Sequence, residues 1–271
     1  MTTLPNSIDI ESLARNLTPA VHEAGARIMT HYGRAEVDLK DDRSPVTEAD
    51  READRVLVSV LAEIAPGIPV ISEESSPRID IDPTAPFFLV DPLDGTREFI
   101  NNRTEFTVNV ALIADRSPLF GAVYAPAASA LYITPGEGRA CKTHLDADAP
   151  YPGYDALALE PIASRAVPAT GMTAAVSRSH LDPDTQAFLD ARGITDTFAS
   201  GSSLKFCCIA EGKADIYPRF GRTMEWDIAA GHAVLAAAGG AVLRDNGEPF
   251  LYGKRSQEYA NPAFIAWGRK P

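Results

Sequence analysis

The sequence predicts a layered α+β fold, in which helices pack against mixed β-sheets. Three observations support this: two amphipathic helical patterns open the chain, strand-like apolar runs follow them, and helical stretches rich in small residues lie toward the C-terminus. Helices and strands mixed in this way favour alternating layers around shared apolar cores. With 271 residues, 45% of them hydrophobic, the chain can form one large domain or two small ones.

The first element is predicted to be a helix over residues 8–31. Its apolar residues recur at steps of three and four, and Asp9 is available as its N-terminal cap. A polar segment over residues 33–47 follows, and a second helix begins at Thr47 and ends before the Pro-Gly pair at residues 66–67. The N-terminal part should therefore contain two helices that flank a charged loop.

Strand-like runs come after the second helix, at residues 68–71, 86–90, 106–114 and 118–124. A stretch rich in Pro, Gly and Ala between about residues 135 and 170 is the best candidate for a boundary between two halves. We therefore expect an N-terminal α+β half over residues 1–150 and a C-terminal α/β half over residues 151–271. The second half is predicted to contain a strand near 173–176 and helices near 182–192, in GSSLKFCCIAEG and in WDIAAGHAVLAAAGG.

Composition and charge exclude several classes of protein. Lys and Arg total 25 against 37 Asp and Glu, and the resulting charge of −12 disfavours binding to DNA, RNA or anionic lipid. The N-terminus lacks a signal-peptide pattern, and no apolar run approaches the ~20 residues that cross a bilayer. We expect a cytoplasmic protein, monomeric or homodimeric, with peripheral contact to the inner membrane left open. Its three cysteines fit neither a disulfide framework nor a metal site and are expected to be buried thiols.

Acidic residues at the ends of predicted strands indicate a metal site. The apolar run FFLV ends in DPLDGT at residues 91–96, where Pro92 favours an extended Asp91 and lets Asp91 and Asp94 turn toward one point. Gly95 permits close approach to an oxyanion, and the amides that follow it could face a phosphate. Taken alone, these six residues could also form a turn with solvated aspartates, which Asp-Pro and Asp-Gly dipeptides often make.

Other acids lie in comparable places. Glu73 and Glu74 follow a short predicted strand, and Asp227 opens a helix. Hard oxygen ligands of this kind suit Mg²⁺. Taken singly, Glu73 could be an exposed loop acid and Asp227 an acid that stabilises a helix N-terminus. Asp50 matches the acidic position of a capping box with Thr47, or it could assist proton removal from an attacking water.

Four ordered motifs resemble those of the inositol monophosphatase superfamily, a group of Mg²⁺-dependent, lithium-sensitive phosphatases. They are K-x-D-x-S-P-V-T-x-A-D at residues 40–50, the acidic pair at 73–74, DPLDGT at 91–96 and WDIAA at 226–230. Within the superfamily the chain is most similar to bacterial 3'(2'),5'-bisphosphate nucleotidases of the CysQ type. The resemblance implies an α-β-α-β-α sandwich and two or three Mg²⁺ ions per active site. It also implies metal ligands Glu73, Asp91, the Leu93 carbonyl, Asp94 and Asp227, with Asp50 and Thr96 activating a water.

Residues outside the metal motifs are expected to determine substrate specificity. Ser202, Ser203 and Lys205 lie in a Gly/Ser turn that opens a helix and could hold a second phosphate or a ribose, although helix capping and a solvent-facing lysine explain them as well. Arg219 stands where inositol-specific relatives carry an acidic residue. A guanidinium group at that position would favour a phosphate, although Arg219 could equally be a surface residue. The full set expected to contact substrate is Glu73, Leu93, Asp94, Gly95, Thr96, Ser202, Ser203, Lys205, Arg219 and Asp227.

These expectations favour a phosphomonoesterase that converts adenosine 3',5'-bisphosphate to AMP, with 3'-phosphoadenosine 5'-phosphosulfate as a further substrate. An inositol- or sugar-phosphate phosphatase is the main alternative, and a non-catalytic phosphometabolite-binding protein is a remote one. The resemblance further predicts inhibition by lithium. The segment 33–47 is expected to become ordered when metal or substrate binds, because it carries Lys40, Asp41, Asp42 and Arg43 near the site.

Overall fold

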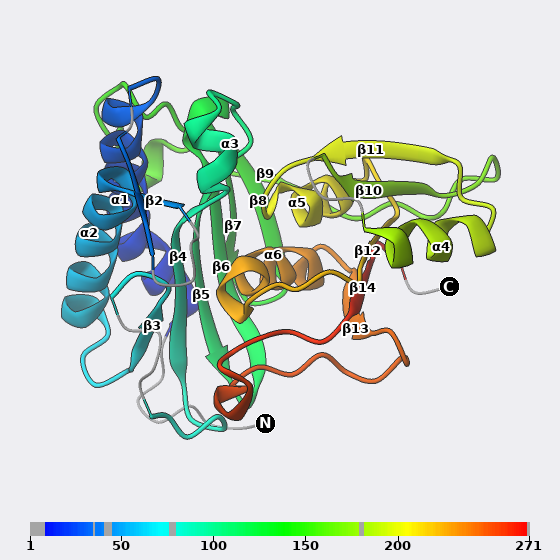
Figure 1. Cartoon of the computed structure of the whole chain (residues 1–271). Coiled ribbons are helices and arrows are strands. Elements are labelled where there is room, and N and C mark those ends of the chain that lie inside the picture. Colours follow the sequence, from blue (N-terminus) through cyan, green and yellow to red (C-terminus); the bar gives the residue numbers. More distant parts are fainter. Residues whose placement is uncertain (1–8, 35, 41–44, 76–79, 179–181, 270–271) are drawn as a thin grey trace.

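The structure is a five-layered α-β-α-β-α sandwich, as the sequence predicts (Figure 1). It is a computed structural model that describes residues 9–34, 36–40, 45–75, 80–178 and 182–269. Helices α1 (Ile10–His31) and α2 (Glu48–Ile64) cover one face of a seven-stranded sheet. Helices α5 (Leu204–Ala210) and α6 (Glu225–Ala237) lie between the two sheets, and α4 (Pro183–Ala191) packs on the outer face of a five-stranded sheet.

The seven-stranded sheet has the order β3-β4-β5-β6-β7-β8-β9. Only β3 and β4 pair in parallel among these described strands, and the other pairs are antiparallel. The strands are β3 (Val70–Ser72), β4 (Phe87–Asp94), β5 (Thr107–Ala114), β6 (Ser117–Ala125), β7 (Ala130–Gly136), β8 (Arg139–His144) and β9 (Glu160–Pro161). A five-residue helix, α3 (Thr96–Ile100), follows β4 directly.

The five-stranded sheet has the order β11-β10-β12-β14-β13. Strand β10 pairs in parallel with β11 and β12, whereas β14 pairs antiparallel with β12 and β13. The strands are β10 (Thr173–Ser177), β11 (Asp196–Ser200), β12 (Ile216–Arg219), β13 (Ala241–Arg244) and β14 (Phe264–Trp267). A small hairpin, β1 (Val37–Leu39) with β2 (Pro45–Thr47), precedes α2, and 3-10 turns occupy Pro126–Ala128, Tyr154–Ala156 and Arg255–Gln257.

The predicted helices agree closely with the observed ones. Asp9 caps α1, because its carboxylate accepts hydrogen bonds from the amides of Glu11 and Ser12 at 3.1 and 3.3 Å. Helix α2 begins after Thr47 and ends at Ile64, just before the Pro-Gly pair. The predicted charged loop contains the β1–β2 hairpin, whereas Asp41, Asp42 and Arg43 lie outside the described residues.

The change from one sheet to the other falls between β9 and β10. The seven-stranded sheet therefore continues past residue 150, through a stretch that the sequence analysis treated as weakly periodic. Strand β9 has two residues, and such a short strand leaves little alternating pattern to detect. The division of the chain at residue 150 stays a prediction.

Small residues let α6 lie directly on the seven-stranded sheet. A side chain at Gly121 in β6 would place its Cβ 2.3 Å from the Ala230 carbonyl oxygen, and one at Gly231 would meet Phe206 of α5 at 2.7 Å. These approaches bring α6 against β4, and Ser203 contacts both Asp94 at the end of β4 and Asp227 near the start of α6. Trp226 is 6% exposed in this core, and its ring lies 6.1 Å from that of Tyr259. It is a packing residue of the core.

Two further expectations concern the thiols and the membrane. Cys141, Cys207 and Cys208 are free and buried, and burial raises the pKa of Cys207 and Cys208, so these thiols are poor nucleophiles. Within the described part of the chain, none of the helices has the length and apolar character required to span a bilayer.

Candidate active site

Two neighbouring parallel strands, β3 and β4, place the first acidic residues side by side. Ser72 is opposite Val90 in the register, and the Glu73 amide donates to the Val90 carbonyl at 3.1 Å, which sets Glu73 beside Asp91. The pairing of β4 with β5 shifts between Asp91 and Asp94, at the Asp-Pro-Leu-Asp sequence. Gly95 then takes φ +95°, a left-handed conformation that turns the chain into α3.

Each oxygen of Asp50 has a different partner, so the residue caps α2 and also contacts the hydroxyl of Thr96. Oδ2 accepts from the amide and the hydroxyl of Thr47, both at 2.7 Å, which closes the N-terminus of α2. Oδ1 accepts from the hydroxyl of Thr96 at 3.2 Å. That hydroxyl also lies 3.2 Å from the Leu93 carbonyl oxygen. Burial raises the pKa of Asp50, which makes its carboxylate a stronger proton acceptor.

Asp94 is held by the turn that precedes α5. Its Oδ2 accepts from Ser202 Oγ at 2.6 Å and from the Ser203 amide at 2.8 Å. Ser203 Oγ lies 3.1 Å from the same oxygen and 2.6 Å from the Asp227 carbonyl oxygen. Ser203 stands at the N-cap position of α5, but its hydroxyl bonds to these two acidic residues instead of capping the helix. The two serines therefore connect Asp94 to the start of α6.

Asp227 occupies the third position of α6, where its Oδ2 accepts from the Met224 amide at 2.8 Å. The first turn of α6 is also held by hydrogen bonds to residues in the segment 253–261. Glu225, which is fully buried, accepts from the amides of Gly253 and Lys254 at 2.8 and 2.9 Å and from Lys254 Nζ at 2.6 Å. Asp227 is thus both a helix N-terminal acid and a residue that faces the site.

The acidic residues act on one another electrostatically. Burial, followed by the charges of Glu73, Asp94 and Asp227, raises the pKa of Asp91 well above its ordinary value. The pKa of Asp227 is raised by burial and by Asp94 and Glu73, and that of Asp94 by burial. Four carboxylates from β3, β4 and α6 are therefore near enough to repel one another in a region of low dielectric.

This donor set fits divalent cations. Several buried carboxylates of like charge are stable together only when protonated or when positive charge lies among them, and carboxylate oxygens are the ligands that Mg²⁺ prefers. Among the described residues, no three acidic, His or Cys side chains form a fully converged metal cluster. Oδ2 of Asp94 and of Asp227 is instead engaged by serine and backbone donors. Cation binding would therefore use the remaining carboxylate oxygens and small movements of these side chains.

Lys40 forms ion pairs with both Glu73 and Glu74. Its ammonium group lies 2.8 Å from Glu73 Oε1 and 2.5 Å from Glu74 Oε1. Burial opposes protonation of Lys40, but the two carboxylates raise its pKa, so it remains charged. The pKa of Glu74 is raised to about 7 by burial, against the opposing effect of Lys40. Lys40 links the loop before α2 to the acidic strand ends.

A cavity of about 150 Å³ opens beside these carboxylates. Six residues predicted to contact substrate line it: Asp94, Gly95, Ser202, Lys205, Arg219 and Asp227. The other four, Glu73, Leu93, Thr96 and Ser203, are not part of its lining: Glu73 follows β3, Leu93 is in β4, Thr96 begins α3 and Ser203 precedes α5. The sequence analysis missed Glu98, Ser177, Tyr217, Arg222 and Thr223, which also line the cavity. Of these, Arg222 and Thr223 lie between two recognised positions, Arg219 and Asp227, and this proximity was the available signal.

Lys205 lines the cavity but is buried, so only the interpretation as a solvent-facing lysine is wrong. It is 5% exposed, so it is not a solvent-facing lysine. Its Nζ donates to the Ser202 carbonyl at 2.7 Å and lies 3.4 Å from the Ser200 carbonyl oxygen. The ammonium group is therefore hydrogen-bonded to the Gly/Ser turn. Burial lowers the pKa of Lys205 to about 8, while Asp94 opposes this shift.

The comparisons identify the family of this fold and site. A model of the inositol monophosphatase family matches residues 9–268. The chain belongs to the inositol monophosphatase family. The 3'(2'),5'-bisphosphate nucleotidase CysQ of Escherichia coli (strain K12) is 42% identical over 256 residues, covering 93% of this chain and 95% of that protein. The same-named protein of Haemophilus influenzae is 31% identical over 262 residues, covering 95% and 93%.

Solved structures of family members have the same fold. The crystal structure of CysQ from Bacteroides thetaiotaomicron matches with a TM-score of 0.79 at 36% identity, covering 96% of this chain and 98% of that one. An inositol monophosphatase from Zymomonas mobilis matches with a TM-score of 0.72 at 23% identity, covering 96% and 93%. At that level of identity, the second match concerns the fold alone.

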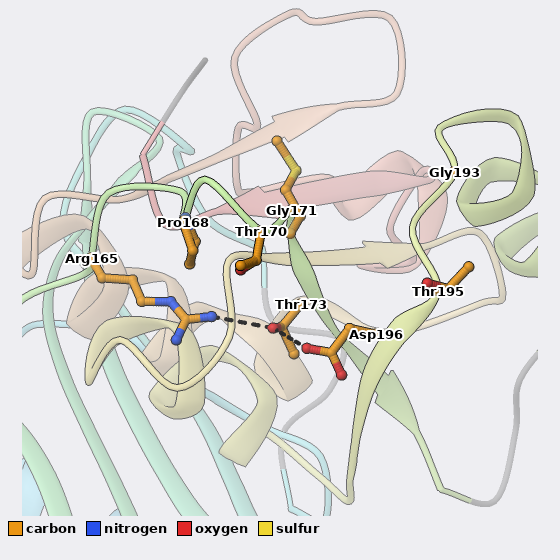
Figure 2. Close-up of a pocket in the computed structure, with 9 residues that line it drawn as sticks. Arg165, Pro168, Thr170, Gly171, Thr173, Gly193, Thr195 and Asp196 are labelled. Atoms are coloured by element: carbon orange, nitrogen blue, oxygen red, sulfur yellow. Dashed lines mark hydrogen bonds between the residues drawn. The ribbon is translucent and has the colours of Figure 1, made fainter.

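A larger cavity of about 360 Å³ lies away from the family's motifs, at the edge of the five-stranded sheet where β10 and β11 begin (Figure 2). Its main cation, Arg165, is paired with Asp215 through two bonds of 2.9 and 2.8 Å. Thr173 Oγ1 accepts from Arg165 at 3.2 Å and donates to Asp196 at 2.6 Å. The polar groups of this cavity are largely satisfied by one another, in contrast to those of the carboxylate site.

Proposed function

We propose that this protein is a Mg²⁺-dependent phosphatase of 3'(2'),5'-bisphosphate nucleotides. Its expected reaction converts adenosine 3',5'-bisphosphate to AMP and phosphate, and 3'-phosphoadenosine 5'-phosphosulfate to adenosine 5'-phosphosulfate. The observation that carries the proposal is that Glu73, Asp91, Asp94 and Asp227 gather at the ends of β3 and β4 and the start of α6, beside a cavity that also contains arginines. The named activity of the relatives, at up to 43% identity, gives the nucleotide as the substrate class.

The proposed metal ligands are Glu73, Asp91, the Leu93 carbonyl, Asp94 and Asp227. Cations held by them would lower the pKa of a water and neutralise the reacting phosphate. Thr96 and Asp50 are placed to take the proton of that water, because the Thr96 hydroxyl donates to Asp50 Oδ1 and can itself accept from a nucleophile. Asp50 stays oriented during this step because its other oxygen is fixed by Thr47.

The test of the substrate class is a comparison of phosphate release from three compounds in the presence of Mg²⁺: adenosine 3',5'-bisphosphate, inositol 1-phosphate and fructose 1,6-bisphosphate. We expect the highest kcat/KM for the nucleotide. A clear preference for either of the other two would overturn the proposal. Activity should disappear in excess chelator and fall when lithium is added, and activity that survives the chelator would contradict the metal dependence.

The test of the metal ligands is Asp94→Asn, which removes a charge but keeps the shape of the side chain. Turnover should fall by at least 100-fold while the protein stays folded, since the substitution also relieves repulsion among buried carboxylates. Asp115→Asn, in the exposed β5–β6 turn, is the matched control and should keep full activity. Unchanged turnover in Asp94→Asn would mean that the ligand assignment is wrong.

A further inference from the structure

A bisphosphate brings a second phosphate that the carboxylate cluster cannot bind. In a chain with a net charge of −12, that group requires local positive charge. Three basic side chains line the cavity: Lys205, Arg219 and Arg222. They differ in how much of their charge and how many of their donors remain for a ligand.

Lys205 has the fewest donors available. Its ammonium group is nearly inaccessible to solvent, is bonded to the Ser202 carbonyl, and has its pKa lowered toward neutrality by burial. It also lies 5.1 Å from the centre of the Tyr217 ring, within cation–π distance. Lys205 therefore orders the turn that holds Asp94 and acts as a positioning residue.

Arg219 has an acidic neighbour. A Cβ added at Gly221 would lie 3.4 Å from Arg219 Cζ and 3.6 Å from Asp182 Oδ2, so the guanidinium and the carboxylate flank the same backbone position. The positive charge of Arg219 contributes to lowering the pKa of Asp182, together with bonds from Thr185. The negative charge of Asp182 therefore reduces the positive electrostatic potential that Arg219 offers to a ligand.

Arg222 is presented by the same loop and has an exposed side chain. The loop joins β12, which ends at Arg219, to α6, which begins at Glu225. Arg219 Nη2 lies 3.4 Å from the Arg222 carbonyl oxygen, and the Asn261 side chain donates to the Thr223 hydroxyl at 3.0 Å and to the Met224 carbonyl at 2.6 Å. These bonds hold the backbone at and just after Arg222, whereas the Arg222 side chain is exposed.

We propose that Arg222 binds the non-reacting phosphate together with Arg219 and is a specificity-determining residue for bisphosphates over monophosphates. The proposal rests on the function proposed above and extends it. A guanidinium group donates two parallel hydrogen bonds to phosphate oxygens and stays charged at every relevant pH. Glu98, which lines the same cavity, disfavours a phosphate close to α3 and leaves the loop between β12 and α6 as the place for it.

The experiment measures kcat and KM for adenosine 3',5'-bisphosphate and for adenosine 3'-monophosphate, which lacks the second phosphate. In Arg222→Ala we expect kcat/KM for the bisphosphate to fall about 10- to 100-fold, mainly through KM, with the monophosphate changed less than about twofold. Arg222→Lys should give an intermediate value, because charge remains but paired hydrogen bonding is lost. Arg27→Ala, which removes an equal charge from the exposed face of α1, is the control and should change neither substrate.

The outcomes separate the two proposals. A wild-type protein that does not prefer the bisphosphate overturns the proposed function, and this inference with it. A wild-type preference that survives intact in Arg222→Ala overturns only the role of Arg222. An equal loss on both substrates also overturns it, because a residue that merely supports the loop would affect both.

Discussion

Replacement of Thr96 by valine removes one hydroxyl from the proposed proton-transfer pair and keeps the branched shape of the side chain. In the structure that hydroxyl lies 3.2 Å from Asp50 Oδ1 and 3.2 Å from the Leu93 carbonyl oxygen. It has a single proton to donate, and both distances are longer than is usual for a hydrogen bond between a hydroxyl and an oxygen. The substitution therefore removes at most one weak bond from the folded state.

The expected effects on stability and on rate differ in size. Loss of one such bond costs about 1 kcal/mol of unfolding free energy. Loss of positioned proton transfer reduces a rate by about 10²- to 10⁴-fold, which corresponds to about 2.7 to 5.5 kcal/mol in the activation barrier. Asp50 keeps its bonds to Thr47, so the N-terminus of α2 should remain closed.

The assay is kcat for adenosine 3',5'-bisphosphate at saturating Mg²⁺, with unfolding by urea measured on the same preparation. Thr96→Ser is the control, because it retains the hydroxyl and should keep most of the activity. A Thr96→Val protein whose kcat stays within threefold of the wild type would refute the assignment of Thr96 to proton transfer.

Three further predictions concern stability. Glu225→Ala leaves the Lys254 ammonium and two backbone amides without their buried acceptor and should cost about 3 to 5 kcal/mol, measured by urea unfolding; a loss below 1 kcal/mol would contradict this. The pKa of Lys205 is about 8 in the folded protein against 10.5 unfolded, so the unfolded state binds more protons between these values and stability should rise with pH across that window. Lys205→Met should lack this rise, and an unchanged pH profile would count against the burial of the charge. Gly121→Ala forces a contact of 2.3 Å with the Ala230 carbonyl and should destabilise by about 1 to 3 kcal/mol, whereas Gly136→Ala, with nothing nearer than 3.8 Å, should have little effect.

Much of the framework was predictable from local patterns. The periodicity of α1 and α2 and their capping residues are properties of neighbouring residues, and they gave the helix starts at Asp9 and Thr47 correctly. The acids at the ends of β3 and β4 are also a local signal, because neighbouring parallel strands end at the same edge of a sheet. From the sequence, helix capping and contact with a catalytic hydroxyl are alternatives for Asp50. The structure shows a cap and a Thr96 contact together, because the two carboxylate oxygens point to different partners.

The side-chain directions around the cavity were not predictable in this way. Lys205 sits on a short helix whose burial depends on the packing of α6 and β12 around it, which no window of sequence describes. Arg222 belongs to a loop without periodicity, and its position follows from bonds to Asn261, almost 40 residues later. Strands β7, β8 and β9 were not predicted, because Gly and Pro interrupt the stretch around them, and β11 to β14, each of four or five residues, were not predicted either.

The two oxygens of the Asp50 carboxylate have different partners, and this limits which substitutions the position can accept. One oxygen keeps a 17-residue helix closed at its first turn, and the other reaches the turn between β4 and α3. With the proposed role of Asp50 in proton transfer, a substitution at this position would change both the stability of α2 and turnover. A variant that replaces Asp50 would therefore need another residue to cap the N-terminus of α2.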